Sequence, residues 1–228
     1  MSVDLLEPAA RALGDLREAV VFLGGATIGL WLTDQAARAP RVTFDVDVIA
    51  VEVTTLGAYE AFQRRLREPR FSEDRESGVI CRWRHEKQGI VLDAVPVREE
   101  LAGFSGRWLS AAVASPVELR LPSGLAIRAV PPAWLVVTKI EAFLGRGASD
   151  CLSSRDFEDI VTLVDGRREL LDELRALPDD ARAFVAREIR AMSRLATFAY
   201  GVEGALPRSD IARADAVVLP RLAAVAEL

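Results

Sequence analysis

The sequence changes character at two adjacent prolines, and this change limits the folds that the chain can adopt. Before Pro131 and Pro132, short runs rich in β-branched residues alternate with amphipathic segments. After them, helix-forming residues continue to the end of the chain. We therefore predict an α+β protein: a minimal mixed sheet with flanking helices over residues 1–130, followed by a C-terminal helical domain over residues 131–228.

The periodicity of apolar residues predicts the individual elements. Strands are expected at 20–23, 43–51, 79–85 and 90–97, and a hairpin is expected at 117–130. Helices are expected at 4–18, 26–37, 56–67, 133–146, 154–175, 180–199 and 208–227.

Composition and charge narrow the possible partners. The 228 residues carry a net charge of −5, with 50% hydrophobic and 28% charged residues. This balance argues against a large basic nucleic-acid surface, although it permits a local basic cluster. Two cysteines and one histidine are too few for a zinc site without carboxylate help, and we expect reduced thiols in a cytoplasmic protein. No signal segment and no apolar run of about 18 residues is visible, so we expect no membrane partner.

The run RVTFDVDVI at residues 41–49 carries two carboxylates on a segment that is otherwise typical of a buried strand. Side chains alternate along a strand, so Asp45 and Asp47 should share one face, with Cα atoms about 6.5 Å apart. The apolar residues beside them, Phe44 included, should line the opposite face. Two like charges at this spacing need a counter-charge, water or a metal ion, and oxygen ligands of this kind suit Mg²⁺. The alternative is the solvated face of an edge strand.

A third acid, Asp93, interrupts the apolar run GIVLDAVPV on the strand predicted at 90–97. It shares a face with valines, and burying an unpaired carboxylate is costly unless something pairs with it. If this strand lies beside 43–51, three carboxylates converge, and such a group can hold one or two metal ions for phosphoryl chemistry. Taken alone, Asp93 is equally well explained as a partly exposed acid near a strand end.

The segment FLGGAT places Gly24 and Gly25 between a predicted strand and a predicted helix. Glycines there allow the backbone to approach a ligand closely, and a helix N-terminus attracts phosphate. The alternative is a turn that tight packing alone requires. A dinucleotide-binding domain is a further rival, because Asp45 follows the glycines by about 20 residues. Its fingerprint needs a glycine where this chain has Ala26, and it leaves the second acid unexplained.

Together these glycines and acids resemble the nucleotidyltransferase superfamily with the polymerase-beta-like minimal fold. The matching residues are Gly24, Gly25, Asp45, Asp47 and Asp93. The resemblance implies that the three acids bind Mg²⁺ or Mn²⁺ and that the glycines cradle the triphosphate of an NTP. It implies transfer of an NMP to an acceptor hydroxyl, which Asp93 helps to activate.

The C-terminal half carries a second resemblance. TKIEAFLGRG, followed by SSRDFEDIVTLVDGR, is similar to segments of the AbiEii-type nucleotidyltransferase toxins. Members of this group are associated with toxin–antitoxin systems, and some add nucleotides to tRNA acceptor ends. The resemblance therefore implies a tRNA or protein acceptor and a cognate antitoxin as partners. It covers about residues 20–168 of the chain.

The same resemblance assigns roles to further residues. Lys139 would contact the triphosphate, Asp156 would belong to the rim of the active site, and Arg146 would add positive charge from the same helical face. Thr27 would hold phosphate where many relatives have a serine at the second glycine. Asp159 could orient a basic partner. Without the resemblance, Lys139 is best explained as a solvated helix lysine, and Asp156 and Asp159 as exposed acids near a helix start.

A different class of protein also fits these residues, namely a non-catalytic nucleotide-binding or regulatory protein that retains the fold. Metal-dependent incorporation of labelled nucleotide separates that class from an enzyme. His85, Cys81 and Cys151 receive no catalytic role, and His85 is expected at the surface.

Overall fold

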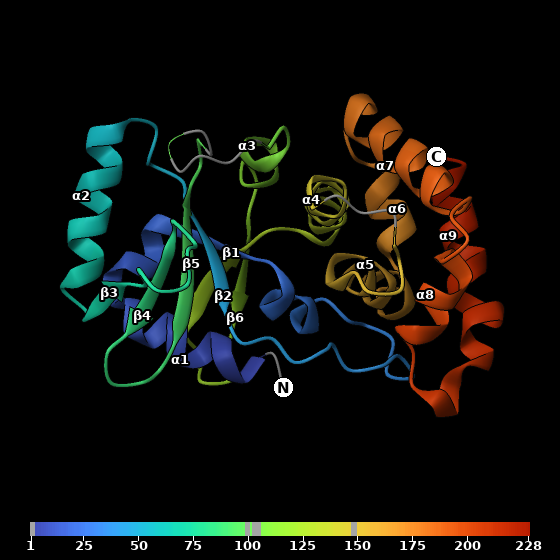
Figure 1. Ribbon diagram of the computed structural model, residues 1–228, viewed down its shortest axis with the longest axis horizontal. Coiled ribbons are helices and arrows are strands. Elements are labelled where there is room, and N and C mark those ends of the chain that lie inside the picture. Colours follow the sequence, from blue (N-terminus) through green and yellow to red (C-terminus); the bar gives the residue numbers. More distant parts are fainter. Residues whose placement is uncertain (1–2, 99–100, 102–105, 147–149) are drawn as a thin grey trace. The chain divides into compact units, whose positions relative to one another are not determined.

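The computed structural model describes residues 3–98, 101, 106–146 and 150–228. The chain forms two compact units (Figure 1): a sheet unit, Met1–Thr27 with Arg41–Pro131, and a helical unit, Ile28–Pro40 with Pro132–Leu228. The predicted α+β class is confirmed, with a mixed sheet, flanking helices and a helical C-terminal part. The domain boundary near residue 130 stays a prediction. The compact units differ from it in one respect, because residues 28–40 group with the C-terminal helices.

Within the described residues, seven strands form one mixed sheet in the order β3-β4-β5-β2-β1-β7-β6. Their bounds are β1 Val20–Leu23, β2 Val46–Ala50, β3 Phe71–Glu73, β4 Arg82–His85, β5 Val91–Pro96, β6 Val117–Arg120 and β7 Ala126–Ala129. β2 is parallel to β5 and β1 is parallel to β7, whereas the other neighbours are antiparallel. The central strands are short apolar runs because residues on both of their faces are buried. One acid interrupts β2 and one interrupts β5.

The helices of the sheet unit follow their local sequence. They are α1 Val3–Leu13, the 3-10 helix η1 Gly14–Ala19, α2 Leu56–Arg67 and α3 Leu109–Ala112. Thr55 caps α2, since its side-chain oxygen accepts a hydrogen bond from the Ala58 N–H at 3.2 Å. Tyr59, Phe62 and Leu66 are buried on one side of α2, at helical spacing. Both ends of α2 fall where the sequence predicts them.

The glycine turn does not open the α-helix that the sequence predicts directly after it. A 3-10 helix, η2, runs over Gly25–Leu30, and the chain is then irregular until β2. The N–H groups of Thr33 and Asp34 donate to the carbonyl of Gly166, at 2.8 and 2.9 Å. Gly166 is the last residue of α5 (Arg155–Gly166). Hydrogen bonds that a helix would make internally therefore go to a distant helix, and tertiary structure overrides the local pattern.

The helical unit is built around α4 and α5, which pack against each other. Its elements are α4 Pro132–Gly145, α5 Arg155–Gly166, α6 Leu170–Arg175, α7 Asp179–Met192, α8 Phe198–Gly204, η4 Arg208–Asp210, η5 Ala214–Val218 and α9 Leu219–Ala226. Ser154 caps α5 by accepting a hydrogen bond from the Phe157 N–H at 3.2 Å. The Phe157 ring then lies 6.1 Å from that of Phe143 and 5.6 Å from that of Phe198, in the core of the unit. Among the described helices, none combines the length and the hydrophobicity that a membrane span requires.

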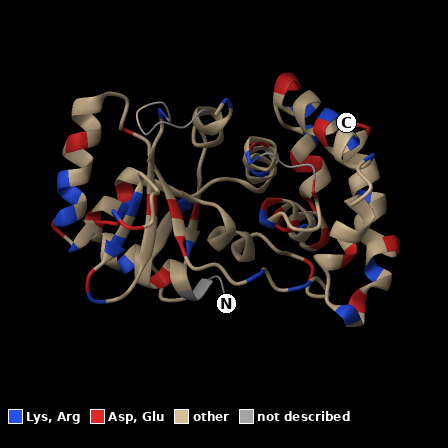
Figure 2. Cartoon of the chain, in the orientation of Figure 1, with Lys and Arg blue, Asp and Glu red and all other residues tan. Residues whose placement is uncertain are grey.

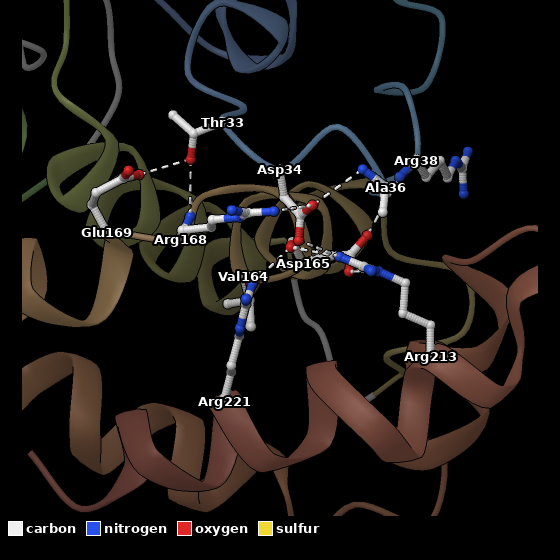
Figure 3. A network of polar contacts seen from close by, with 10 residues as sticks. All are labelled: Thr33, Asp34, Ala36, Arg38, Val164, Asp165, Arg168, Glu169, Arg213 and Arg221. Atoms are coloured by element: carbon white, nitrogen blue, oxygen red, sulfur yellow. Dashed lines mark hydrogen bonds and ion pairs between the residues drawn. The ribbon is translucent and has the colours of Figure 1, made fainter.

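A network of ion pairs attaches residues 28–40 to the rest of the helical unit (Figure 3). Arg213 donates to Asp34 Oδ2 at 2.9 Å and to the carboxylate of Asp165. Arg168 donates to the other oxygen of Asp34 at 3.1 Å. The hydrogen bond from Arg213, helped by a backbone N–H and by Arg168, holds the pKa of Asp34 well below its ordinary value. These contacts explain why a segment from early in the chain belongs to the helical unit.

Candidate functional site

The two acids inside the sheet lie side by side. β2 and β5 are parallel neighbours, and their register pairs Asp47 with Asp93. Residues paired in this way point to the same face of a sheet. Asp93 is only 8% exposed, and it lies between the buried residues Leu92 and Ala94. The register therefore brings two of the three predicted acids together in the centre of the sheet, where acidic residues are red in Figure 2.

Asp45 approaches this pair from outside the strand. The strand predicted over 43–51 begins only at Val46, so Asp45 lies in the segment that precedes β2. The sequence predicts Phe44 on the buried face, but the residue is 76% exposed because the strand does not extend to it. Asp45 nevertheless shares a partner with Asp93.

That partner is Arg82, the first residue of β4. Its Nε donates to Asp93 Oδ1 at 2.8 Å, and its Nη2 donates to Asp93 Oδ2 at 2.7 Å. The same Nη2 donates to Asp45 Oδ2 at 2.8 Å. The hydrogen bonds to Asp93 raise the pKa of Arg82, and the charges of Asp93, Asp45 and Asp47 add to this effect. One guanidinium therefore supplies the counter-charge that the paired acids require.

Arg82 is a residue of the candidate site that the sequence analysis above does not predict, although the pattern of β4 contains a signal for it. β4 alternates between buried and more exposed positions, with Trp83 and His85 buried and Arg82 and Arg84 on the other face. β4 is antiparallel to β5, and the register sets Arg82 opposite Asp93. An arginine on the acid face of a strand next to β5 is thus the natural counter-ion. Finding it requires the strand order, which the periodicity of one strand does not contain.

The glycine turn is shaped by Asp47. Gly24 has a φ of +77°, which favours glycine, and a Cβ atom at this position would lie 2.0 Å from Asp47 Oδ2. A side chain at residue 24 would therefore displace the carboxylate. The Thr27 side chain is buried and donates a hydrogen bond to the Gly24 carbonyl at 2.9 Å, which fixes the turn. The predicted contacts of Gly24, Gly25 and Thr27 with phosphate stay predictions.

Cys81 lies next to the acids but is not a nucleophile. Burial raises the pKa of its thiol to about 12, and the charges of Asp93 and Asp47 contribute to the shift. The thiol therefore stays protonated at neutral pH, whereas nucleophilic attack requires the thiolate.

His85 is buried, which corrects the prediction that it lies at the surface. It is 7% exposed, and its ring lies edge-on to Phe71 with the ring centroids 5.1 Å apart. Its Nδ1 accepts a hydrogen bond from the backbone N–H of Gln88 at 3.2 Å. His85 therefore stabilises the turn after β4 and has no part in the candidate site.

In this structure a guanidinium occupies the carboxylate oxygens that a divalent metal ion would use. Arg82 binds both oxygens of Asp93 and one oxygen of Asp45, and these are the atoms that a cation would need. In the part of the chain that the structure describes, no three His, Cys, Asp or Glu residues are grouped so that they could hold a metal. Two of the three predicted ligands, Asp45 and Asp93, are therefore paired with a guanidinium.

The predicted site residues of the C-terminal half meet one another within the helical unit. Lys139, on α4, lies 2.6 Å from Asp159 Oδ2 and 3.1 Å from Asp156 Oδ1, both on α5. Arg146, just after α4, pairs with the other oxygen of Asp156. Asp156 and Asp159 are one helical turn apart and face the same neighbour, which explains why one lysine contacts both.

Lys139, Asp156 and Asp159 are buried, although without the resemblance the sequence predicts that they are exposed. The side chain of Lys139 is 12% exposed, and those of Asp156 and Asp159 are 4% and 1% exposed. Lys139 is therefore not a solvated helix lysine, and the two acids are not exposed residues of a first turn. The side chain of Arg146 is 72% exposed and closes the cluster from the solvent side. The roles that the resemblance implies for Lys139, Arg146 and Asp156 stay predictions.

Comparison with known proteins identifies the class of fold. One solved structure, an antigenic nucleotidyltransferase-like protein from Paracoccidioides brasiliensis, is similar over 91% of this chain and 95% of that chain. The TM-score is 0.50 and the sequence identity is 16%, a likeness that shows a shared fold. No protein-family model matches the chain, and no curated protein matches its sequence. The protein thus has a nucleotidyltransferase-like fold.

Proposed function

We propose that this protein is a nucleotidyltransferase, which moves an NMP from an NTP to an acceptor hydroxyl. One observation carries the proposal. In a fold shared with a nucleotidyltransferase-like protein, the register of β2 and β5 sets Asp47 beside Asp93, next to the bare turn at Gly24. Phosphoryl transfer requires that the negative charge of the phosphates be offset and that the backbone approach them closely. Paired acids can hold a cation that offsets this charge, and a glycine turn allows the close approach.

The proposal includes Mg²⁺, or Mn²⁺ in its place, as the resemblance to the superfamily implies. Asp45, Asp47 and Asp93 are the residues that would hold the ion. When bound, the ion would offset the negative charge of the phosphates.

The chain's own residues supply position and access. At Gly24 the missing side chain leaves room for the Asp47 carboxylate, and Gly25 would present its backbone to the phosphates of the NTP. Thr27 keeps that turn in shape through its hydrogen bond to the Gly24 carbonyl. Before the ion and the substrate bind, Arg82 holds the carboxylates of Asp45 and Asp93 toward each other.

The finer proposal is a toxin of a toxin–antitoxin pair that acts on tRNA in the cytoplasm. Its support is the similarity of the segments around Lys139 and Asp156 to AbiEii-type toxins. A protein hydroxyl is the other acceptor that this similarity implies, and a cognate antitoxin is the implied partner.

The test is incubation of the purified full chain with each labelled NTP and Mg²⁺ or Mn²⁺, with total RNA or a protein extract as acceptor. We expect label to enter one acceptor class and to disappear with a chelator. Asp47→Asn should abolish the transfer, whereas Asp179→Asn, at a side chain that is 94% exposed, should not. Transfer by Asp47→Asn at the parent rate would contradict the proposal.

A second candidate is a non-catalytic nucleotide-binding or regulatory protein, and the Arg82 contacts favour it specifically. The guanidinium satisfies Asp93 and Asp45 without a metal, as a retained but unused acid group would require. Such a protein binds NTP equally well with and without a chelator and transfers no label. Equilibrium binding of a fluorescent NTP, measured beside the transfer assay, distinguishes the two.

A further inference from the structure

We infer that Arg82 is a resident counter-ion that competes with a divalent cation for Asp45 and Asp93. The inference rests on the proposed function, because the cation is the one that nucleotidyl transfer calls for. It explains why Asp45 and Asp93 are paired with Arg82, and why the described residues contain no group of three metal-ligating side chains.

The competition follows from the atoms that the guanidinium uses. Three donor contacts, all between 2.7 and 2.8 Å, take up both oxygens of Asp93 and one of Asp45. A cation that coordinates Asp93 must replace at least one of these charge-assisted hydrogen bonds. The affinity for the cation is therefore lower than the carboxylates alone would give.

The charges favour exchange. Two carboxylates and one guanidinium leave one negative charge in this group, and Asp47 lies directly beside Asp93. A divalent cation carries twice the charge of the guanidinium at the same oxygens, so a sufficient concentration of the ion displaces it.

The exposure of the side chains makes the exchange possible without unfolding. The side chains of Arg82, Asp45 and Asp93 are 21%, 39% and 12% exposed, so the guanidinium can turn toward water. Arg82 has a long flexible side chain, while its backbone stays paired with β5. The cation and the guanidinium can therefore exchange by side-chain rotation alone.

The experiment measures Mn²⁺ binding to the full chain by electron paramagnetic resonance, in which bound ions lose the signal of the free ion. Arg82→Gln should bind Mn²⁺ about tenfold more tightly than the parent or better, because the competing hydrogen bonds are gone. The matched control is Arg84→Gln, which removes the same charge two residues further along β4. Arg84 pairs with Asp74 at 2.7 Å and should leave the Mn²⁺ affinity unchanged. Equal affinity of Arg82→Gln and the parent, or no binding by either, overturns the inference.

A second variant covers the case in which Arg82→Gln does not fold, as judged by its thermal melting without metal. Arg82→Lys keeps the positive charge but cannot make the paired contact with Asp93 while reaching Asp45. Its Mn²⁺ affinity should lie between those of the parent and Arg82→Gln, and an affinity equal to that of the parent overturns the inference.

The binding and transfer assays can fail independently. Tighter Mn²⁺ binding by Arg82→Gln in a chain that transfers no nucleotide leaves the inference standing and removes the proposed function. If Arg82→Gln binds Mn²⁺ no more tightly than the parent while the parent transfers nucleotide, the inference is overturned and the proposed function stands.

Discussion

The sheet unit and the helical unit each contain a cationic side chain between two carboxylates, but the two clusters are built differently. In the sheet unit, the side chain of Arg82 is 21% exposed, and those of its partners Asp45 and Asp93 are 39% and 12% exposed. In the helical unit, Lys139 is 12% exposed and its partners Asp156 and Asp159 are almost completely buried. Breaking an ion pair costs more free energy as burial increases. The first cluster is therefore suited to exchange its partners, whereas the second is part of the core.

This comparison also bears on the role that the resemblance implies for Lys139. An ammonium group that offsets charge on a triphosphate must have charge to offer. The Lys139 ammonium already lies within 3.1 Å of two carboxylates, so a phosphate would have to share it with Asp156 and Asp159.

The largest effect that we predict is the loss of stability in Lys139→Ala. The substitution leaves two buried carboxylates without their lysine, which should lower the free energy of unfolding by about 3–5 kcal/mol. This differs from the small cost of less than about 0.5 kcal/mol expected for an exposed lysine. Chemical denaturation of the full chain measures the change.

Arg146→Ala is the matched control for this variant. It removes a cation that also contacts Asp156 but is 72% exposed, so it should cost less than about 1 kcal/mol. Similar costs for the two variants would show that burial does not set the strength of the Lys139 ion pairs.

The next largest effect concerns the glycine beside the exchangeable cluster. Gly24→Ala should cost about 2–3 kcal/mol, because an alanine is strained at positive φ and its Cβ overlaps Asp47. It should also reduce nucleotide transfer by displacing the Asp47 carboxylate.

Gly78→Ala isolates the strain from the overlap. Gly78 has a φ of +71° and nothing within 4 Å of the added Cβ, so we expect a cost of about 1 kcal/mol. Thermal and chemical unfolding of both variants gives the difference. If the two costs are equal, Asp47 is not what makes the glycine at position 24 necessary.

A smaller stability effect should accompany a large functional one in Asp45→Ala. The Asp45 side chain is 39% exposed and Arg82 keeps its two contacts with Asp93, so the cost should stay below about 1 kcal/mol. Relief of repulsion between the acids is not expected, since Arg82 already offsets their charge. Nucleotide transfer should be lost. An active Asp45→Ala enzyme would remove this residue from the site.

The smallest predicted effect is acid sensitivity in the helical unit. The pKa of Asp34 in the folded protein lies below its pKa in the unfolded chain. At pH values between these two, the unfolded state therefore binds more protons than the folded state. The contribution of Asp34 to stability is therefore present above the unfolded pKa and is lost as the pH falls through the folded pKa. Between about pH 4 and pH 2, the melting temperature should fall more steeply for the parent than for Asp34→Asn. Asp179→Asn, whose side chain is 94% exposed, should behave like the parent.

Local patterns predicted the elements well where packing agrees with periodicity. Strand β1 and helix α2 fall at the expected residues, because a buried apolar run and an amphipathic stripe each require one local structure. The segment after Gly25 was predicted wrongly as an α-helix, since its N–H groups bond to Gly166 in a helix far along the chain. Such a partner is invisible to a local pattern.

The acids of the candidate site could be predicted, but their surroundings could not. Asp47 and Asp93 stand out because each is a carboxylate within an apolar strand, and the sequence alone shows this. The counter-charge from Arg82 depends on β4 lying next to β5, with a register that pairs residues 82 and 93. The sequence therefore indicated that the acids need a counter-charge, water or a metal ion, but not that the chain itself supplies the counter-charge.

The chain passes between its two units three times, after Thr27, after Pro40 and after Pro131. During synthesis on the ribosome, residues 28–40 emerge long before the helices that hold them. Asp34 cannot form its ion pair until Arg213, 179 positions later, has been made. Folding of the helical unit can therefore be completed only after Arg213 has left the ribosome, around a segment that was made much earlier. A chain that ended before Arg213 would lose one of the two arginines that hold Asp34, and residues 28–40 would be held less firmly.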